Sequence, residues 1–291
     1  MSELIGLMER LEANYNKFSK GQKRIADFIR ENYDKAAYYT AAKLGSEVGV
    51  SESTVVRFAT ELDYEGYPEL QKAIAATVKT HSNSIKRLEN IMFRMENENS
   101  LLDLIMKEDC VRVRETPAGV DPAMFEKVVD TIVKADSIYI VGVRSAWYLA
   151  GMMGYYFRMI FERVNVLEGS GNVDTFEEII RLKENDVLIG ISFPRYSLRT
   201  AKAMELAKKN HAKTITITDS MQSPLIEYAD FPLIAKSDVI GIVDSLTAPL
   251  SLINALVVAV SIRKKDELES RLHVLEELWN EYKVYDDHVI D

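Results

Sequence analysis

Two arginines stand directly after strand-like runs of the sequence, where side chains can meet a ligand. Arg144 follows the run 137–141, and Arg195 follows the run 186–191. A guanidinium makes planar, bidentate, charge-assisted hydrogen bonds to phosphate or carboxylate, about twice as strong as neutral ones. We therefore expect an anionic ligand at these two loops. The alternative is that either arginine pairs with a carboxylate of its own domain, such as Asp219 or Asp244.

A second group of polar residues lies on a short predicted helix, 52–62. Gly45 and Gly49 precede it and suit a helix-turn-helix, which needs a small residue where its helices touch and a left-handed backbone at the turn. Ser51 is a good N-cap for the second helix. Its outward residues are candidates for base and phosphate contacts in a DNA major groove: Glu52, Ser53, Val56 and Arg57. The alternative is an ordinary helical hairpin whose glycines only end helices.

The elements that must position these residues differ along the chain. Residues 1–80 show helical spacing without a strand, and a charged helical connector follows over 81–120. From 121 onward, short apolar runs at 137–141, 164–167, 186–191, 214–218 and 231–234 alternate with helical segments at 146–161, 198–209 and 245–263. A last amphipathic helix is expected over 266–285. Strands that alternate with helices indicate a parallel sheet covered on both faces.

The fold class predicted is therefore an all-α helix-turn-helix domain (1–80) joined by the connector (81–120) to an α/β doubly wound parallel-sheet domain (121–291). Right-handed crossovers and the strand–helix alternation support the second domain. In such sheets, ligands bind beyond the carboxyl ends of the strands. The loops 142–146 and 192–200 lie at that edge.

Composition excludes several classes of protein. The chain of 291 residues has 36 Lys and Arg against 45 Asp and Glu, a net charge of −9, so it is not coated in basic surface. One cysteine and four scattered histidines give no zinc motif and no internal disulfide, and we expect no cofactor or metal. No targeting segment is recognised, and the uncharged run 245–262 reads as a buried helix rather than a membrane span. These features predict a soluble, cytoplasmic protein without membrane contact.

The N-terminal residues resemble a known family. The runs FSKGQKRIADFIREN (18–32) and LGSEVGVSESTVVRFATELDYEGYPELQKAI (44–74) are similar to the DNA-binding domain of RpiR-type transcriptional regulators. The recognition-helix pattern VSxSTVVRF matches from Ser51 to Phe58. The following pattern LGFxGYxELK matches at Leu62, Gly66, Tyr67, Glu69 and Leu70, whereas Asp63 stands where glycine is usual.

The resemblance implies a C-terminal sugar-isomerase (SIS) domain that senses phosphorylated sugars. The loop after the first strand matches the SIS phosphate loop only in part, because Arg144 replaces its second glycine. The loop after the third strand keeps Ser192 and Thr200, whereas Pro194 and Arg195 replace a Ser-Gly pair. We predict that the effector is a small anionic sugar-type metabolite and that these residues bind it: Arg144, Ser145, Ser192, Arg195, Tyr196, Ser197 and Thr200.

The corresponding partner of the N-terminal domain is double-stranded operator DNA. The predicted contact residues are Lys43, Ser51, Glu52, Ser53, Thr54, Arg57 and Tyr67. Lys20, Lys23 and Arg24 are further candidates for phosphate contacts. A lone helix-turn-helix reads few base pairs, so we expect a homodimer or a dimer of dimers.

Two alternatives remain open at this point. A sugar-phosphate isomerase would need a base, for which Glu168, Glu177 and Glu178 are the nearest candidates, although solvated helix positions suit them better. A protein-interaction module would use the helical hairpin without DNA. Other loop residues are predicted to cap turns or helices rather than to bind ligand: Asp219, Ser220 and Ser223, and the pair Asp244-Ser245 before the long helix.

Overall fold

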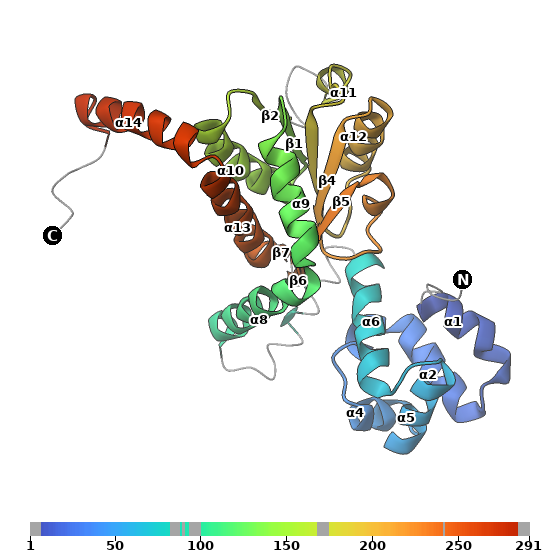
Figure 1. Cartoon of the computed structure of the whole chain (residues 1–291). Helices are drawn as coiled ribbons and strands as arrows, with labels where there is room; N and C mark the ends of the chain where they lie inside the picture. The colour runs from blue at the N-terminus through green and yellow to red at the C-terminus, as the bar shows by residue number, and fades with distance from the viewer. Residues whose placement is uncertain are drawn as a thin grey trace. The chain divides into compact units, whose positions relative to one another are not determined.

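The computed structural model describes residues 7–81, 88, 91–92, 100–167, 175–240 and 242–284. It divides into an N-terminal unit, Met1–Leu101 with Val239–Val243, and a C-terminal unit, Leu102–Asp238 with Asp244–Asp291 (Figure 1). Each unit has a buried hydrophobic core of its own. Most of the first half of the predicted connector lies outside the described residues.

The described part of the N-terminal unit is helical over residues 7–81, and its only strand residues come from the short segment Val239–Val243. Its elements are α1 (Leu7–Asn14), η1 (Tyr15–Lys17), α2 (Lys20–Glu31), α3 (Tyr33–Ala36), α4 (Ala41–Val48), α5 (Glu52–Glu61) and α6 (Tyr67–His81). Local capping explains where the helices begin. Ser19 forms a reciprocal capping box with Gln22 at the start of α2, and Thr40 caps α4. The prediction of an all-α domain is confirmed.

The apolar faces of α2, α4 and α5 meet in one core. Ile25, Leu44, Val55 and Phe58 are fully buried there, and the Phe58 ring lies 5.1 Å from the ring of Phe18. Truncating a buried aromatic side chain to alanine costs about 3–5 kcal/mol of folding free energy. This core therefore holds α5 at a set angle to its neighbours, which is what a DNA-reading helix requires.

The C-terminal unit is built on a five-stranded parallel sheet. The strands are β1 (Ile138–Gly142), β2 (Val164–Leu167), β3 (Val187–Ile191), β4 (Lys213–Thr218) and β5 (Phe231–Ile234), in the order β2-β1-β3-β4-β5. All five predicted runs are strands. Gly142 of β1 is level with Ile191 of β3, so the loops after these central strands leave the sheet side by side.

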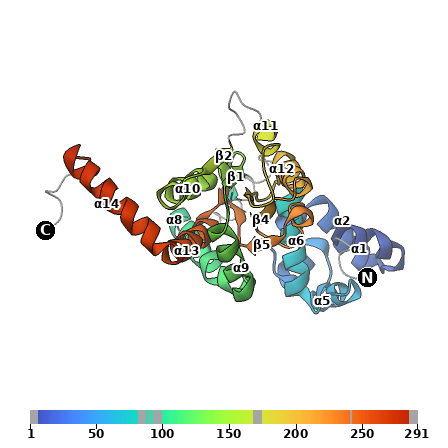
Figure 2. The same ribbon diagram turned by 45° about the horizontal axis from the view of Figure 1, so that its top comes forward.

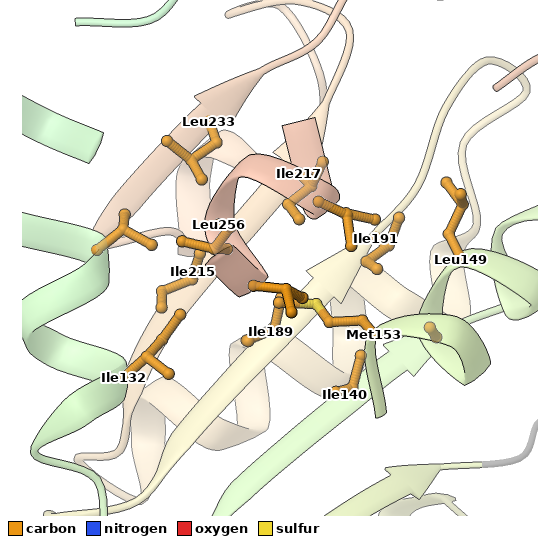
Figure 3. Close-up of a cluster of buried hydrophobic side chains, with 14 of the residues drawn as sticks. Ile132, Ile140, Leu149, Met153, Ile189, Ile191, Ile215, Ile217, Leu233 and Leu256 are labelled. Carbon is orange, nitrogen blue, oxygen red and sulfur yellow. The ribbon is translucent and has the colours of Figure 1, made fainter. Parts of the chain in front are cut away.

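Helices cover both faces of this sheet, which confirms the doubly wound class (Figure 2). One face carries α9 (Pro122–Val133), α10 (Ser145–Ile160) and α13 (Thr247–Arg263), and the other carries α11 (Thr175–Ile179) and α12 (Leu198–Lys209). The first face buries a dense aliphatic layer that includes Ile140, Ile189, Ile215 and Leu256 (Figure 3). Burial on both faces explains why these strands read as continuous apolar runs.

Four further elements complete the unit around the sheet. They are α8 (Leu101–Glu115), η2 (Thr116–Gly119), η3 (Ile226–Tyr228) and α14 (Lys265–Glu281). The predicted last helix is confirmed as α14. Among the described residues, no single helix has the length and apolarity to cross a membrane; α13 and α14 meet those criteria only as a pair, and they are bent by 98°.

A short two-stranded sheet was not predicted. It consists of β6 (Asp238–Ile240) and β7 (Val243–Ser245), just before α13. The expectation that Asp244 and Ser245 form the N-cap of α13 is wrong, because the helix begins at Thr247 after Leu246, without a side-chain cap. Both side chains are instead hydrogen-bonded to distant residues.

Candidate DNA interface and effector site

The turn between α4 and α5 depends on two glycines. Gly49 has φ of +66°, a left-handed conformation that glycine adopts without strain. A Cβ on Gly45 would lie 2.8 Å from the carbonyl oxygen of Val50, which is backbone and cannot move aside easily. Arg24 of α2 holds the same turn, because its Nη2 donates to the Gly49 carbonyl at 3.0 Å. This arrangement is the helix-turn-helix that the sequence predicted.

Hydroxyl groups cluster at the exposed start of α5. The Ser51 side chain caps the helix by accepting from the Thr54 backbone N–H, as predicted. Its Oγ also lies 2.9 Å from the Ser53 Oγ and 2.8 Å from the Thr54 Oγ1. Glu52 and Ser53 are exposed, and Thr54 is partly so. Helix N-termini with free donors and hydroxyls suit phosphate oxygens and base edges.

Arg57 projects from the same helix into an open groove. The groove is lined by Ser19, Gln22, Thr54, Arg57, Thr60 and Glu61. Glu61, one helical turn beyond Arg57, accepts a hydrogen bond from the Gln22 side chain. No hydrogen bond or ion pair engages the Arg57 guanidinium within the described residues, so it is available for an acceptor outside the protein.

The lysines near this helix differ in their surroundings. Lys43 is exposed on the first turn of α4, with its Nζ 5.8 Å from the centre of the Tyr39 ring. Lys20 is exposed at the start of α2, whereas the Lys23 ammonium lies over the Tyr15 ring at 5.3 Å. Arg24, a candidate for phosphate contact, already donates a hydrogen bond to the Gly49 carbonyl of the turn. Lys20 and Lys43 are therefore the freer cations of this set.

Tyr67 does not belong to the candidate interface. Its side chain is buried, and its hydroxyl donates to the Tyr39 carbonyl at 2.7 Å. Burial raises the pKa of the Tyr67 phenol to about 12. The prediction that Tyr67 contacts DNA is therefore wrong. Its position on α6 turns the side chain toward the core, where its hydrogen bond connects α6 to the segment before α4.

In the C-terminal unit, the predicted loops 142–146 and 192–200 follow the adjacent strands β1 and β3, where the strand order reverses. The helix after β1, α10, covers one face, and the helix after β3, α12, covers the other. Adjacent strands whose following helices diverge leave a crevice at their carboxyl ends, where open α/β sheets bind ligands. Gly142 is required there, because a Cβ would lie 2.5 Å from the carbonyl oxygen of Ala146.

Arg144 adopts a strained backbone conformation at this crevice. Its φ of 60° and ψ of −127° suit glycine and cost an ordinary residue on the order of 1–3 kcal/mol. The Arg144 side chain is exposed. Ser145 next to it donates from its Oγ to Asp244 at 3.0 Å. An arginine held where glycine fits better is consistent with a function for its side chain.

The hydroxyls after β3 support the loop itself. The Ser192 Oγ accepts from the Ser197 backbone N–H at 3.0 Å, and the Ser197 side chain caps α12 by accepting from the Thr200 N–H. Thr200 is fully buried, and its Oγ1 has no hydrogen-bond partner among the described residues. Ser192 and Ser197 thus have structural roles, and Thr200 keeps an unmet hydrogen-bonding capacity.

Arg195 and Tyr196 complete the predicted set. Burial, followed by the charge and hydrogen bond of Asp219, raises the pKa of Tyr196 well above its usual value, so its hydroxyl stays protonated and donates to Asp219 at 2.8 Å. Arg195 is exposed. Within the described residues, neither Arg195 nor Arg144 forms an ion pair or a hydrogen bond through its side chain. The carboxylates considered as their partners, Asp219 and Asp244, instead accept from Tyr196 and Ser145.

The remaining predicted loop residues have separate positions. The Ser220 and Ser223 side chains accept backbone N–H groups of the following turn, as expected of caps. Glu177 and Glu178 lie on α11, where Glu177 is exposed, and Glu168 lies outside the described residues. The described part of the chain contains no group of three His, Cys, Asp or Glu residues suited to hold a metal.

The sequence did not predict a polar network that connects α8 to the residues around the start of α13. Asp109 of α8 accepts from the Ser245 Oγ at 2.5 Å and from the Thr247 Oγ1 at 2.9 Å. Arg112, one turn later and largely buried, donates to Glu108 and to Asp238. Ser245 adjoins Asp244, the partner of Ser145. No local signal marks Asp109, because it is one carboxylate among many on a charged helix.

Comparison with known proteins places both units. The model of the rpiR-family helix-turn-helix domain matches residues 5–81, and the model of the SIS domain matches residues 131–259. The chain belongs to the RpiR-type transcriptional regulators. An uncharacterized HTH-type transcriptional regulator of Haemophilus influenzae is 27% identical to this RpiR-type chain, covering 89% of it and 92% of the relative. A second one, from Clostridium perfringens, is 26% identical, with 79% and 81% covered.

Solved structures share the fold of this RpiR-type chain. The sugar isomerase domain of the RpiR transcription factor from Sphaerobacter thermophilus superimposes with a TM-score of 0.58 at 24% identity, covering 61% of this chain and 98% of that one. The Vibrio vulnificus NanR protein, solved in complex with ManNAc-6P, gives a TM-score of 0.56 at 21% identity, covering 94% and 99%. At these identities the likeness concerns the fold alone.

Proposed function

We propose that this RpiR-type regulator binds operator DNA through α5 and that a phosphorylated sugar, bound at the crevice beyond β1 and β3, changes its affinity for that DNA. The observation that carries the proposal is the pair of exposed guanidiniums, Arg144 and Arg195, which no carboxylate of the described residues neutralises. Two cations at the carboxyl edge of a parallel sheet favour a dianionic group. The phosphate of the NanR ligand belongs to this chemical class.

The hydroxyls of the crevice suit the sugar part of such a ligand. The Tyr196–Asp219 and Ser145–Asp244 pairs present oxygen atoms that accept hydrogen bonds, whereas the Thr200 hydroxyl is fully buried and closed to a ligand. Sugar hydroxyls both donate and accept. The arginines would therefore supply affinity for the anion, and the polar pairs would select among sugars.

Regulation by the ligand requires that the crevice be coupled to the rest of the chain. The Ser145 hydroxyl donates a hydrogen bond to Asp244. The next residue, Ser245, donates a hydrogen bond to Asp109 on α8. A ligand that draws Ser145 or Arg144 toward itself would shift this chain of contacts and with it α8. Typical coupling free energies of about 1–3 kcal/mol change the affinity for the second ligand about 5- to 150-fold.

Changing Asp109 to asparagine should uncouple effector binding from the affinity for operator DNA. The amide keeps one acceptor oxygen of the two that Ser245 and Thr247 engage, so the link is weakened while the fold is kept. We expect the effector to change operator affinity less than about twofold in the variant, with effector binding retained. Fluorescence anisotropy of labelled operator with and without effector measures this effect. Glu115→Gln, on the exposed end of α8, is the matched control and should keep the full response.

The function as a whole is tested by ligand stabilisation and duplex binding. A ligand at a hundredfold excess over its Kd stabilises the folded chain by about 2.7 kcal/mol. We expect hexosamine and hexose 6-phosphates, with ManNAc-6P among them, to raise the thermal midpoint, whereas the same sugars without phosphate do not. The effective compound should also change the affinity for duplexes selected from a random library. Absence of both effects would overturn the proposal.

Catalysis is not part of the proposal. An isomerase needs a base beside the reacting carbon, and the described carboxylates of the crevice, Asp219 and Asp244, already accept hydrogen bonds from Tyr196 and Ser145. Turnover of the stabilising sugar phosphate to a second product would favour the isomerase alternative. We further propose that the regulator acts in the cytoplasm, where both DNA and sugar phosphates are found, and that it acts as a homodimer.

A further inference from the structure

The side chain of Gln22 connects the start of α2 to the end of α5 through both halves of its amide. Its Oε1 accepts from the Ser19 backbone N–H at 2.8 Å, and its Nε2 donates to the Glu61 carboxylate. A backbone N–H can only donate, so its partner must be the amide oxygen, and the NH2 group is thereby turned toward Glu61. The capping box at the start of α2 thus fixes how Gln22 meets Glu61.

Glu61 is the acid of α5 that is placed to neutralise Arg57. Side chains three or four residues apart on a helix are neighbours. At these spacings from Arg57 stand Ser53, Thr54, Thr60 and Glu61. Only the last of these carries a negative charge. The Arg57 and Glu61 side chains are both exposed and line the same groove, so nothing in their burial keeps them apart.

A pair of opposite charges at the same spacing elsewhere in the chain does form an ion pair. Glu205 and Lys209, on the exposed side of α12, lie 2.6 Å apart. Arg57 and Glu61, which both belong to the described residues, form none. An acid that precedes its base on a helix pairs better than one that follows it, as Glu61 does. The attraction between Arg57 and Glu61 is therefore weak enough for one competing hydrogen bond, from Gln22, to hold the carboxylate away.

We propose that Gln22 is a positioning residue for DNA binding: by holding Glu61, it keeps that carboxylate from Arg57 and leaves the guanidinium available to the operator. Without the Gln22 amide, the Glu61 side chain would rotate toward Arg57 and compete with DNA for it. The inference rests on the proposed role of α5 and adds to it a residue of another helix that does not itself have to touch DNA.

Replacing Gln22 with alanine should raise the Kd for operator about two- to fourfold. An exposed ion pair at this spacing changes an equilibrium constant about twofold, and the proposed homodimer would experience the change at both of its recognition helices. Fluorescence anisotropy of labelled operator at low salt measures the effect. The ratio of variant to wild-type Kd should fall toward one as salt is added, because salt screens the competing ion pair. Loss of a capping hydrogen bond alone would not produce that trend.

The effect of Gln22→Ala should disappear when either of the competing charges is absent. Gln22→Ala/Glu61→Ala should bind operator as Glu61→Ala does, and Gln22→Ala/Arg57→Ala should bind as Arg57→Ala does. Residues that act through one another give such non-additive changes. A glutamine that only stabilised α2 would instead weaken binding by the same factor in all three backgrounds.

Exchanging the two residues tests the hydrogen bond itself and keeps the capping box. Gln22→Glu retains an acceptor for the Ser19 N–H, so the start of α2 should stay folded, but it has no donor for Glu61. This variant should weaken operator binding at least as much as Gln22→Ala. Gln22→Glu/Glu61→Gln has the net charge of the wild type, and the new amide at position 61 donates to the new carboxylate at position 22. Its operator affinity should return to within twofold of the wild type.

Gln71→Ala is the matched control. The Gln71 Nε2 also donates across the domain, to the Tyr39 carbonyl at 2.9 Å, but Gln71 does not line the groove. This variant should leave operator affinity unchanged. Wild-type affinity in Gln22→Ala, or an equal loss with and without Glu61, would overturn the inference while the proposed function stands. An unchanged affinity in Arg57→Ala would overturn the proposed role of α5 and this inference with it.

Discussion

Replacing Arg57 with alanine is expected to weaken operator binding about 10- to 100-fold and to leave the fold unchanged. A good bidentate contact to a base is worth about 1–3 kcal/mol of discrimination. The Arg57 side chain is exposed and, within the described residues, forms no hydrogen bond or ion pair that the substitution would remove, so the thermal midpoint should stay within experimental error. Fluorescence anisotropy at one fixed salt concentration measures the effect, because affinity for DNA depends strongly on salt.

The control for Arg57 removes the same charge elsewhere on the domain. Arg30 lies at the other end of α2 from the groove and is 3.7 Å from Glu12 in an exposed pair. Arg30→Ala should change operator affinity less than about threefold. Affinity for the effector should be unaltered in Arg57→Ala. If the affinities for effector and operator fell together, the assignment of DNA binding to the N-terminal unit and of effector binding to the C-terminal unit would be wrong.

Removing both crevice arginines is expected to abolish the response to effector without loss of DNA binding. A hydrogen bond to a charged group contributes about 1.5–3 kcal/mol, so Arg195→Ala or Arg144→Ala alone should weaken effector binding about 10- to 100-fold. The double variant should show no stabilisation by sugar phosphate in a thermal-shift titration. Arg181→Ala, an exposed arginine after α11, should respond like the wild type.

Arg144 also permits a test in which stability and function change in opposite directions. Glycine adopts φ of 60° freely, whereas alanine there keeps the strain. Arg144→Gly should therefore be more stable to unfolding than Arg144→Ala by about 1 kcal/mol, although both lose effector affinity. Equal stability of the two variants, measured by urea unfolding, would contradict the assignment of strain to this residue.

The sequence predicted the elements well because each carries its own periodic signal. Runs such as 187–191 are buried on both faces and consist of apolar residues, which identifies a central parallel strand. The helix-turn-helix was recognisable because Gly49 must adopt a positive φ and Gly45 must admit the Val50 backbone, and few other residues serve there. The short β6–β7 pair escaped prediction because three-residue strands lack a periodic pattern.

Predictions about individual side chains were less secure, and two of them failed for a common reason. Tyr67 was assigned to the DNA surface from its place in a motif, but the packing of α6 turns it to the Tyr39 carbonyl. Asp244 and Ser245 were assigned to the start of α13, but they bind Ser145 and Asp109. In each case a polar group had several local options, and a distant partner determined which one was used.

The residue types and their local order thus determined by themselves the two kinds of unit, the turn between α4 and α5, and the presence of arginines in the loops after β1 and β3. Only the tertiary structure decided that those arginines find no partner among the described residues, while Asp219 and Asp244 accept hydrogen bonds from Tyr196 and Ser145. The physical reason is distance along the chain. The Ser145–Asp244 bond spans 99 residues and the Asp109–Ser245 bond spans 136, so only the packing of the sheet and its helices brings these groups within hydrogen-bonding range.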